Sequence, residues 1–356
     1  MRLVKVLILL SLFSIAGFYF LEQNDISPEE AMDRVTNVVQ EKKNMLETKI
    51  APEEVTVDIP LEGALYNWIG KSSDELVQVL GEPHRKDLSA YGYTWWVYTD
   101  QSNQYIQFGV DEEEIKTIYA TGSDLEIEPV IVGQSYASVE ESFPFLNEIT
   151  YSKGVSSYTF HVNVNDIQMR PLVKLTDDIF IQFYFDTFTS KLSSIRILTA
   201  ETLLEHRPYE VKYRGSLPGE PDLSDEGWAE VEQGMEQQIY DITNVIRKQH
   251  EKTKLEWEDS VSDVAFKHSK DMADNNYFSH YSPDGSGLKE RLEAGNVSHA
   301  GAGENIAAQY PDAAAAVEGW LNSEGHREAL LSDDFTHLGV GVYRLYYTQN
   351  FLAKPF

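Results

Sequence analysis

The spacing of hydrophobic residues changes along the chain and divides it into parts. Residues 6–21 are largely apolar and carry no charge, whereas residues 24–57 are polar and have no dense hydrophobic face. From about residue 60 to 210, short runs rich in Val, Ile, Tyr and Trp alternate with turn residues, which is typical of strands. From about residue 238 onward, apolar residues recur at helical spacing. We therefore predict an α+β protein with a sheet-rich front part and a helix-containing rear part.

The front part, residues 59–212, contains a weak internal duplication. The pattern Gly-x-Ser occurs at residues 70–72 and again at 133–135, each time before apolar residues at helical spacing. Later, Tyr105-Ile-Gln-Phe108 matches Phe180-Ile-Gln-Phe183, and acidic residues and another apolar run follow each of them. Each unit is therefore predicted to be one helix followed by a small antiparallel sheet, and the domain to be a two-unit repeat.

One strand of the front part is unusually aromatic. The run Tyr91-Gly-Tyr-Thr-Trp-Trp-Val-Tyr98 alternates along a predicted strand, so that one face would be lined with rings. Core packing explains such a face, and an aromatic recognition surface is the alternative.

An acidic segment separates the two parts. Residues 215–237 carry seven acidic residues and no basic one, together with several Gly and Pro. We interpret residues 213–237 as a solvated acidic linker that limited proteolysis would cut first. The rear domain then comprises residues 238–356.

The rear domain alternates helices with short strands. Ile239, Ile242 and Ile246 are spaced as one helix, and a second helical stripe runs from Val261 to Met272. A turn-rich loop follows, and the chain ends in a run that reads as a strand. The helices are therefore predicted to frame a short sheet in layers.

Several motifs in this rear domain occur together in a fixed order. They are His268-Ser-Lys-Asp-Met-Ala273, Phe278-Ser-His-Tyr-Ser-Pro-Asp-Gly285, Gly303-Glu-Asn-Ile-Ala307, Trp320-Leu-Asn-Ser-Glu-Gly-His-Arg327 and Gly339-Val-Gly341. With them, residues 238–356 resemble the CAP superfamily (cysteine-rich secretory, antigen 5 and pathogenesis-related proteins) in its bacterial form. The front domain, with Gly81-Glu-Pro83 and the aromatic run, also resembles the N-terminal domain that accompanies CAP domains in some spore-forming Gram-positive bacteria.

The resemblance implies an α-β-α sandwich and a ligand-binding cleft that holds two histidines and up to two glutamates. By motif, His280, Glu304 and His326 occupy three of these places. The second glutamate aligns with Ser323, and Glu324 follows one residue later, so this chain departs from the full set of four.

Two neutral imidazoles and a carboxylate are also a common ligand set for a divalent metal such as zinc, with one position left open. His280, His326 and Glu304 are therefore a candidate metal site. The alternative is a structural cluster in which these side chains hydrogen-bond one another. No catalytic residue is assigned, because no serine near the histidines lies in a strand-turn-helix elbow.

The amino-acid composition limits the classes of partner and of chemistry that are open to the chain. The chain has 58 acidic and 29 basic residues, a formal net charge of −29, and no cysteine. Such a negative chain repels phosphate backbones, so we expect no nucleic-acid partner. The lack of cysteine excludes disulfides, thiolate metal sites and cysteine nucleophiles.

The N-terminus indicates the compartment. Arg2 and Lys5 precede the apolar run, which fits a membrane anchor or a secretory signal within residues 1–23, followed by a stalk over residues 24–58. No small-x-small cleavage site follows the run cleanly, which favours an uncleaved anchor. We therefore expect the chain at the extracytoplasmic face of the cell membrane, or secreted if the segment is cleaved.

Two functional hypotheses follow. In the first, the chain is a membrane-anchored surface protein whose CAP domain binds a surface ligand or envelope component without turning it over. In the second, it is an extracytoplasmic, metal-dependent hydrolase that uses His280, Glu304 and His326. Lipid carriage is known among relatives, but no apolar groove is evident from this sequence. The added front domain favours the first hypothesis.

Overall fold

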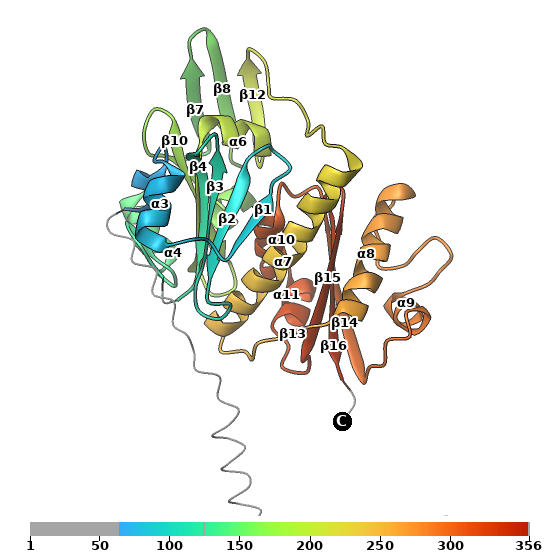
Figure 1. Ribbon diagram of the computed structural model, residues 1–356. Helices are drawn as coiled ribbons and strands as arrows, with labels where there is room; N and C mark the ends of the chain where they lie inside the picture. The colour runs from blue at the N-terminus through green and yellow to red at the C-terminus, as the bar shows by residue number, and fades with distance from the viewer. Residues whose placement is uncertain (1–63, 124, 355–356) are drawn as a thin grey trace, which may run out of the picture. The chain divides into compact units, whose positions relative to one another are not determined.

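The computed structural model describes residues 64–123 and 125–354 (Figure 1). The predicted anchor or signal, residues 1–23, and the predicted stalk, residues 24–58, lie outside the described residues. Within the described ranges, no helix combines the length and the apolar character that crossing a membrane requires. The described residues belong to one unit, in which a sheet-rich front domain precedes a helix-containing C-terminal domain.

The front domain is built on a seven-stranded antiparallel sheet in the order β1-β2-β3-β4-β11-β10-β9. Its strands are β1 (Arg85–Leu88), β2 (Thr94–Thr99), β3 (Tyr105–Asp111), β4 (Glu114–Thr121), β9 (Leu172–Lys174), β10 (Ile179–Asp186) and β11 (Lys191–Thr199). The smaller sheets contain β5 (Glu126–Ile127) with β6 (Val130–Ile131), and β7 (Glu148–Lys153), β8 (Ser156–His161) and β12 (Glu210–Arg214). The helices are η1 (Leu65–Trp68), α3 (Ser73–Leu80), α4 (Tyr136–Ser142), α5 (Val164–Met169) and α6 (Ala200–His206).

The two Gly-x-Ser segments have the same local structure. Gly70 and Gly133 have φ of 84° and 89°, a conformation that glycine adopts at no steric cost. Ser72 and Ser135 are the N-caps of α3 and α4, and each hydroxyl accepts a hydrogen bond from a backbone N–H in the first turn. The strands that follow in each unit, β4 and β11, pair with each other at the centre of the large sheet. The two segments of the predicted repeat therefore contribute to one continuous sheet.

Both faces of this sheet are buried. On β4, Ile118 and Ala120 belong to one hydrophobic cluster with Leu76 of α3, whereas Tyr119 belongs to a second cluster on the opposite face. Trp95 lies in the second cluster with an exposed fraction of 1%. The aromatic stretch of β2 is therefore part of the core.

The C-terminal domain is an α-β-α sandwich, as predicted. Its elements are α7 (Asp225–Gln249), β13 (Glu256–Trp257), α8 (Asp259–Asp274), α9 (Leu288–Ala294), β14 (Gly301–Ala308), α10 (Ala313–Leu321), α11 (Glu324–Leu330), β15 (His337–Tyr343) and β16 (Tyr346–Ala353). The sheet has the order β13-β15-β16-β14, in which only the short β13–β15 pair is parallel. Helices α8 and α9 cover one face, and α7, α10 and α11 cover the other (Figure 1).

The alternation of residues on β15 sets the spacing of these layers. Leu338, Val340 and Val342 lie in the same hydrophobic cluster as the buried face of α7. Gly339 and Gly341 face α8, where a Cβ would collide with the helix backbone. The two glycines therefore allow α8 to lie directly on the sheet.

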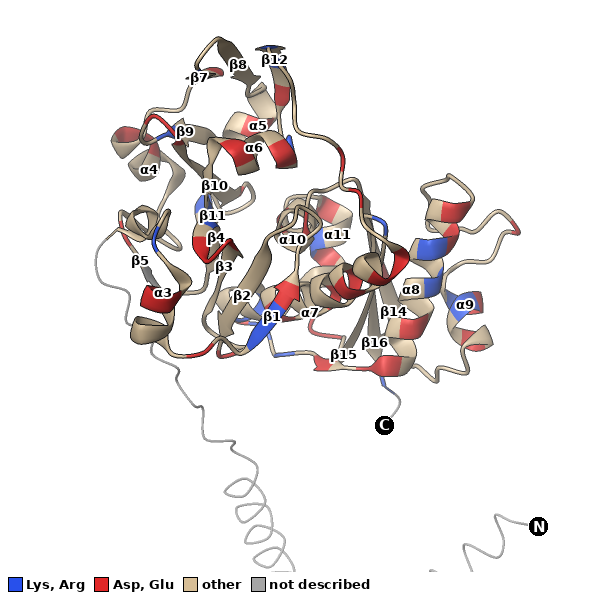
Figure 2. Cartoon of the chain, turned by 45° about the horizontal axis from the view of Figure 1, so that its top comes forward, with Lys and Arg blue, Asp and Glu red and all other residues tan. Residues whose placement is uncertain are grey.

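The structure differs from the predicted acidic linker. Residues 225–237, expected to be part of a solvated segment at 213–237, are the first half of α7. Val231 and Met235 are buried at helical spacing ahead of Ile239, and this apolar stripe was obscured by the acidic residues that recur along α7 (Figure 2). Residues 215–224, between β12 and α7, contain no helix or strand.

Helix α7 joins the two domains into one hydrophobic cluster. Tyr93, Tyr105 and Tyr184 of the front domain share this cluster with buried residues of α7 and α10. Buried polar contacts cross the same boundary. Arg196 Nη2 of β11 donates to Asp312 Oδ1, the N-cap of α10, at 2.8 Å. The large sheet of the front domain is therefore covered by the C-terminal domain.

We expect Gly341→Ala to lower the free energy of unfolding by about 2–3 kcal/mol, because the added methyl group meets backbone atoms of Ala265 and Phe266 that cannot turn away. Gly325→Ala is the control, since its Cβ would have no atom within 4 Å, and it should be neutral or stabilising by about 0.5 kcal/mol. Denaturant unfolding of both variants measures the difference. Equal stability of the two variants would show that α8 does not require these glycines.

A second prediction concerns Glu318 of α10, a buried acid at the domain boundary. Its Oε1 accepts hydrogen bonds from Tyr119 at 3.1 Å and from Ser194 at 2.5 Å, and burial raises its pKa from 4.5 to about 7. The stability that the neutral carboxyl contributes is fully present below pH 4.5. It is lost as the pH rises through about 7, by an amount on the order of 3 kcal/mol.

Because glutamine stays neutral, Glu318→Gln should not lose this stability. As the pH rises from 4.5 to 7, the free energy of unfolding of the wild type should therefore fall relative to that of Glu318→Gln. Glu328→Gln, at an exposed position on α11, is the control and should follow the wild type. Denaturant titrations at several pH values measure the effect. Parallel pH profiles for Glu318→Gln and the wild type would contradict it.

Candidate functional site

Three separate elements bring the predicted site residues together. His280 lies in the loop between α8 and α9, Glu304 lies on β14, and His326 lies on α11. Nδ1 of His280 is 2.9 Å from Oε1 of Glu304, and the centroids of the two imidazole rings are 6.3 Å apart. We call these three residues, with Arg291 and Ser323, the histidine cluster.

Glu304 is the buried anchor of the histidine cluster. Its side chain is 4% exposed, whereas that of His280 is 48% exposed. Burial opposes ionisation of Glu304, but the hydrogen bond with His280 and the charge of Arg291 outweigh it and hold the pKa of this carboxyl below its ordinary value. Glu304 is therefore an ionised carboxylate that orients the His280 ring.

Arg291 of α9 completes this arrangement, and it was not predicted as a site residue. Its Nη2 donates to Oε2 of Glu304 at 2.6 Å, and its Nη1 donates to the backbone carbonyl oxygens of His280 and Ser286 at 3.0 and 3.1 Å. One guanidinium therefore fixes both the carboxylate and the loop that carries His280. No motif marks Arg291, because its carboxylate partner lies on β14, a strand that only the fold brings beside α9.

His326 is held from its own helix and from β14. Its Nδ1 is 2.8 Å from the hydroxyl of Ser323, and its carbonyl oxygen accepts from Nδ2 of Asn305 at 3.0 Å. Burial, and then the neighbouring His280, lower the pKa of His326, which favours the neutral ring. Glu324, the other candidate at this place, is exposed in the first turn of α11.

The described residues do not fit a metal site with three protein ligands. Among residues 64–123 and 125–354, no group of three His, Asp or Glu side chains is arranged to hold an ion. Both oxygens of Glu304 are already engaged by His280 and Arg291. The carboxylate therefore acts as a partner that orients an imidazole, and an ion between the rings would have two protein ligands where catalytic zinc usually has three.

His268 contacts the backbone of the loop that carries His280. It is 1% exposed on α8, and its Nε2 is 3.1 Å from the carbonyl oxygen of Ser279, next to His280. Burial lowers the pKa of His268, so the neutral ring is favoured. Its position agrees with its place on the apolar stripe of that helix.

Two aromatic side chains flank His280 on the surface. Phe278 and Tyr281 are 54% and 67% exposed, and within the described part of the C-terminal domain they are the large hydrophobic side chains that remain exposed. Both lie in the loop that carries His280. A loop that exposes aromatic rings together with polar side chains is typical of a binding surface.

Two family models match the chain. One, described as CAP-associated N-terminal, matches residues 69–209, and the other, described as the cysteine-rich secretory protein family, matches residues 240–353. Together they span the front domain and the C-terminal domain, which confirms the resemblance drawn from the motifs.

Relatives and solved structures agree with these matches. The chain is 48% identical over 325 residues to "Uncharacterized membrane protein YlbC" of Bacillus subtilis, covering 89% of this chain and 92% of the relative. A crystal structure of an extracellular protein containing an SCP domain from Bacillus anthracis matches with 44% identity and a TM-score of 0.79, covering 86% of this chain and 100% of that one. A cysteine-rich secretory protein from Staphylococcus aureus matches with 25% identity and a TM-score of 0.74, covering 82% of this chain and 94% of that one. The chain therefore belongs to the CAP, or cysteine-rich secretory protein, family, in the bacterial form that carries a CAP-associated N-terminal domain.

Proposed function

We propose that this protein is anchored in the cell membrane and exposes its CAP domain outside the cytoplasm, where the histidine cluster binds an envelope ligand without turning it over. The observation that carries the proposal is the pairing of an oriented, solvent-accessible His280 with the exposed rings of Phe278 and Tyr281. The loop therefore offers a ligand both an imidazole and aromatic rings.

The proposed location rests on the N-terminal sequence and on the relatives. Arg2 and Lys5 precede the apolar residues 6–21, the order expected of a membrane anchor. The Bacillus subtilis relative is named a membrane protein, and the solved Bacillus anthracis relative is described as extracellular. Both descriptions favour a chain that is tethered at its N-terminus and folded outside the cell.

The protonation states in the histidine cluster support binding over hydrolysis. The downward pKa shifts keep Glu304 ionised and His326 neutral, so neither side chain holds the proton that a general acid would donate. Ser323 contacts His326, but among the described residues no carboxylate contacts that ring to orient it as a base. A serine nucleophile of the Ser-His-Asp kind needs such an orienting acid.

The surface chemistry suggests a polar, ring-containing polymer such as the glycan of the cell wall. Sugar rings have C–H faces that pack on aromatic side chains, and hydroxyl groups that bond to imidazole nitrogens. In the described part of the chain, Nε2 of His280 has no hydrogen-bond partner, so this nitrogen is available to a ligand. The net charge of −29 disfavours polyanions as the ligand.

Co-sedimentation of the detergent-solubilised full chain with insoluble peptidoglycan tests the proposal. His280→Ala should weaken binding about five- to tenfold, because the lost imidazole removes hydrogen bonds and packing worth about 1–1.4 kcal/mol. The double variant Phe278→Ala/Tyr281→Ala should weaken it about tenfold or more, because both exposed rings are removed. Chelator should leave wild-type binding unchanged.

His161→Ala, which removes a partly exposed histidine from β8 of the front domain, is the matched control and should bind as the wild type does. Equal binding by all variants would show that the histidine cluster is not the binding surface. Release of soluble fragments by the wild type, lost with chelator or in His280→Ala, would instead establish the metal-dependent hydrolase.

A further inference from the structure

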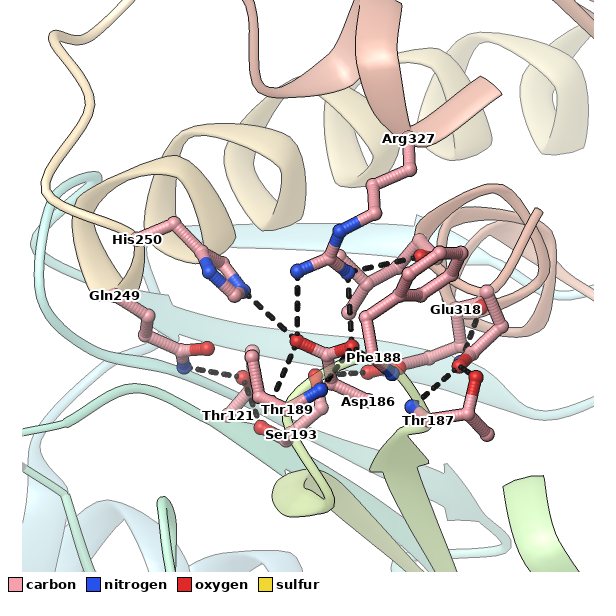
Figure 3. Close-up of polar contacts among 12 residues, drawn as sticks. Thr121, Asp186, Thr187, Phe188, Thr189, Ser193, Gln249, His250, Glu318 and Arg327 are labelled. Atoms are coloured by element: carbon pink, nitrogen blue, oxygen red, sulfur yellow. Dashed lines mark hydrogen bonds and ion pairs between the residues drawn. The ribbon is translucent and has the colours of Figure 1, made fainter. Parts of the chain in front are cut away.

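The front domain holds the helix that carries His326. The turn between β10 and β11 reaches the C-terminal domain, and Asp186, at the end of β10, is 3% exposed there (Figure 3). Its two carboxylate oxygens each accept from the guanidinium of Arg327, both at 2.9 Å. Arg327 is the residue next to His326 on α11. A bidentate bond of this kind fixes orientation as well as distance.

The turn between β10 and β11 also contacts the junction between α10 and α11. The backbone N–H and the hydroxyl of Thr187 both donate to Oδ1 of Asn322 at 2.8 Å. Arg327 also donates to the carbonyl oxygen of Leu321 at 3.0 Å, and its guanidinium lies 4.7 Å from the ring centroid of Phe188. The turn therefore contacts the end of α10 and the first turn of α11 together.

Asp186 is itself held firmly by its own turn. Its Oδ1 accepts from the backbone N–H of Phe188 at 3.0 Å, and its Oδ2 accepts from the hydroxyl of Thr189 at 2.8 Å (Figure 3). Its carboxylate is therefore pre-oriented before it meets Arg327. Such support is what allows a side chain to impose its geometry on a neighbour.

Helix α11 has little hydrophobic anchoring of its own. It is seven residues long, and Leu330 at its far end is its one buried residue. At the His326 end, polar contacts therefore decide where the helix lies. Asn305 of β14 holds the backbone of His326 from one side, and the turn holds Arg327 from the other.

We propose that Asp186 is a positioning residue for His326, so that the front domain completes the histidine cluster of the C-terminal domain. When Asp186 loses its charge, the first turn of α11 becomes more mobile, whereas the other contacts between the two domains are retained. The consequence for ligand binding rests on the proposed function, but the positioning itself does not.

A comparison of two buried interdomain ion pairs tests the proposal. Asp186→Asn breaks the pair at α11. Asp241→Asn is the matched control: it breaks the pair in which Arg85 of β1 meets Asp241 of α7 at 3.0 Å, with the same domains involved and no contact to α11. In each variant the arginine keeps another partner, Leu321 O for Arg327 and Asp87 for Arg85.

Hydrogen exchange of the full chain should show amides 322–330 exchanging about tenfold faster in Asp186→Asn and within about twofold of the wild type in Asp241→Asn. The ring resonances of His326, but not those of His268, should move in Asp186→Asn. Arg327→Lys, which keeps the charge and loses the bidentate geometry, should have the same effect on α11 and replaces Asp186→Asn if that variant does not fold.

Unchanged exchange over residues 322–330 in a folded variant would overturn the proposal. So would a uniform rise that is the same in Asp186→Asn and Asp241→Asn, because it would show general destabilisation only. Both readouts are independent of any ligand. Loosening of α11 with unchanged peptidoglycan binding would therefore support the positioning role and contradict the proposed function alone.

Discussion

The fold depends on the seven-stranded sheet of the front domain, both faces of which are buried. One face of the seven-stranded sheet packs on its own helices, and the other presents Trp95, Tyr105 and Tyr119 to α7 and α10 of the C-terminal domain. Several fully buried side chains on this second face are polar, and burial of polar groups is favourable only when they find partners. For Tyr119, Thr121 and Arg196 the partner comes from the C-terminal domain, so this face of the front sheet is complete only when the CAP domain covers it.

The polar partners make this boundary specific. Arg196 pairs with Asp312, and Glu318 accepts from hydroxyl groups of β4 and β11. A hydrophobic contact alone tolerates sliding, but a buried ion pair and a buried acid with several donors hold one register. The same boundary extends to Asp186 and Arg327, next to His326. The placement of α11 is therefore a consequence of how the two domains meet.

Much of this arrangement could be predicted from the sequence, and the misses have physical causes. The motifs located His280, Glu304 and His326, and helical spacing identified the sandwich. The first half of α7 was not predicted as a helix. Acidic residues lie beside Val231 and Met235, and the acidic composition of the segment was given more weight than the helical spacing of these two residues. Arg291 was missed because it belongs to no motif, and its bond to Glu304 depends on how β14 packs beside α9.

The covered face of the front sheet shows a more general limit. Along β4, Thr117, Tyr119 and Thr121 alternate with apolar residues, the pattern of a strand with one solvated face. All of these side chains are nevertheless buried, because another domain covers them. Sequence patterning reports which residues share a face, but not what lies against that face when the cover comes from a distant part of the chain.

The central claim is that the front sheet and the CAP domain are one cooperative structure. Hydrogen exchange of the full chain at increasing denaturant measures the opening free energy of individual strands. The most protected amides of β3 and β11 should share one opening free energy with those of β15 and β16, because Tyr105 of β3 lies in the same hydrophobic cluster as β15 and β16, and Arg196 of β11 pairs with Asp312 of the C-terminal domain. Protection that persists in β15 and β16 after β3 and β11 have opened would contradict the claim and show two independent domains.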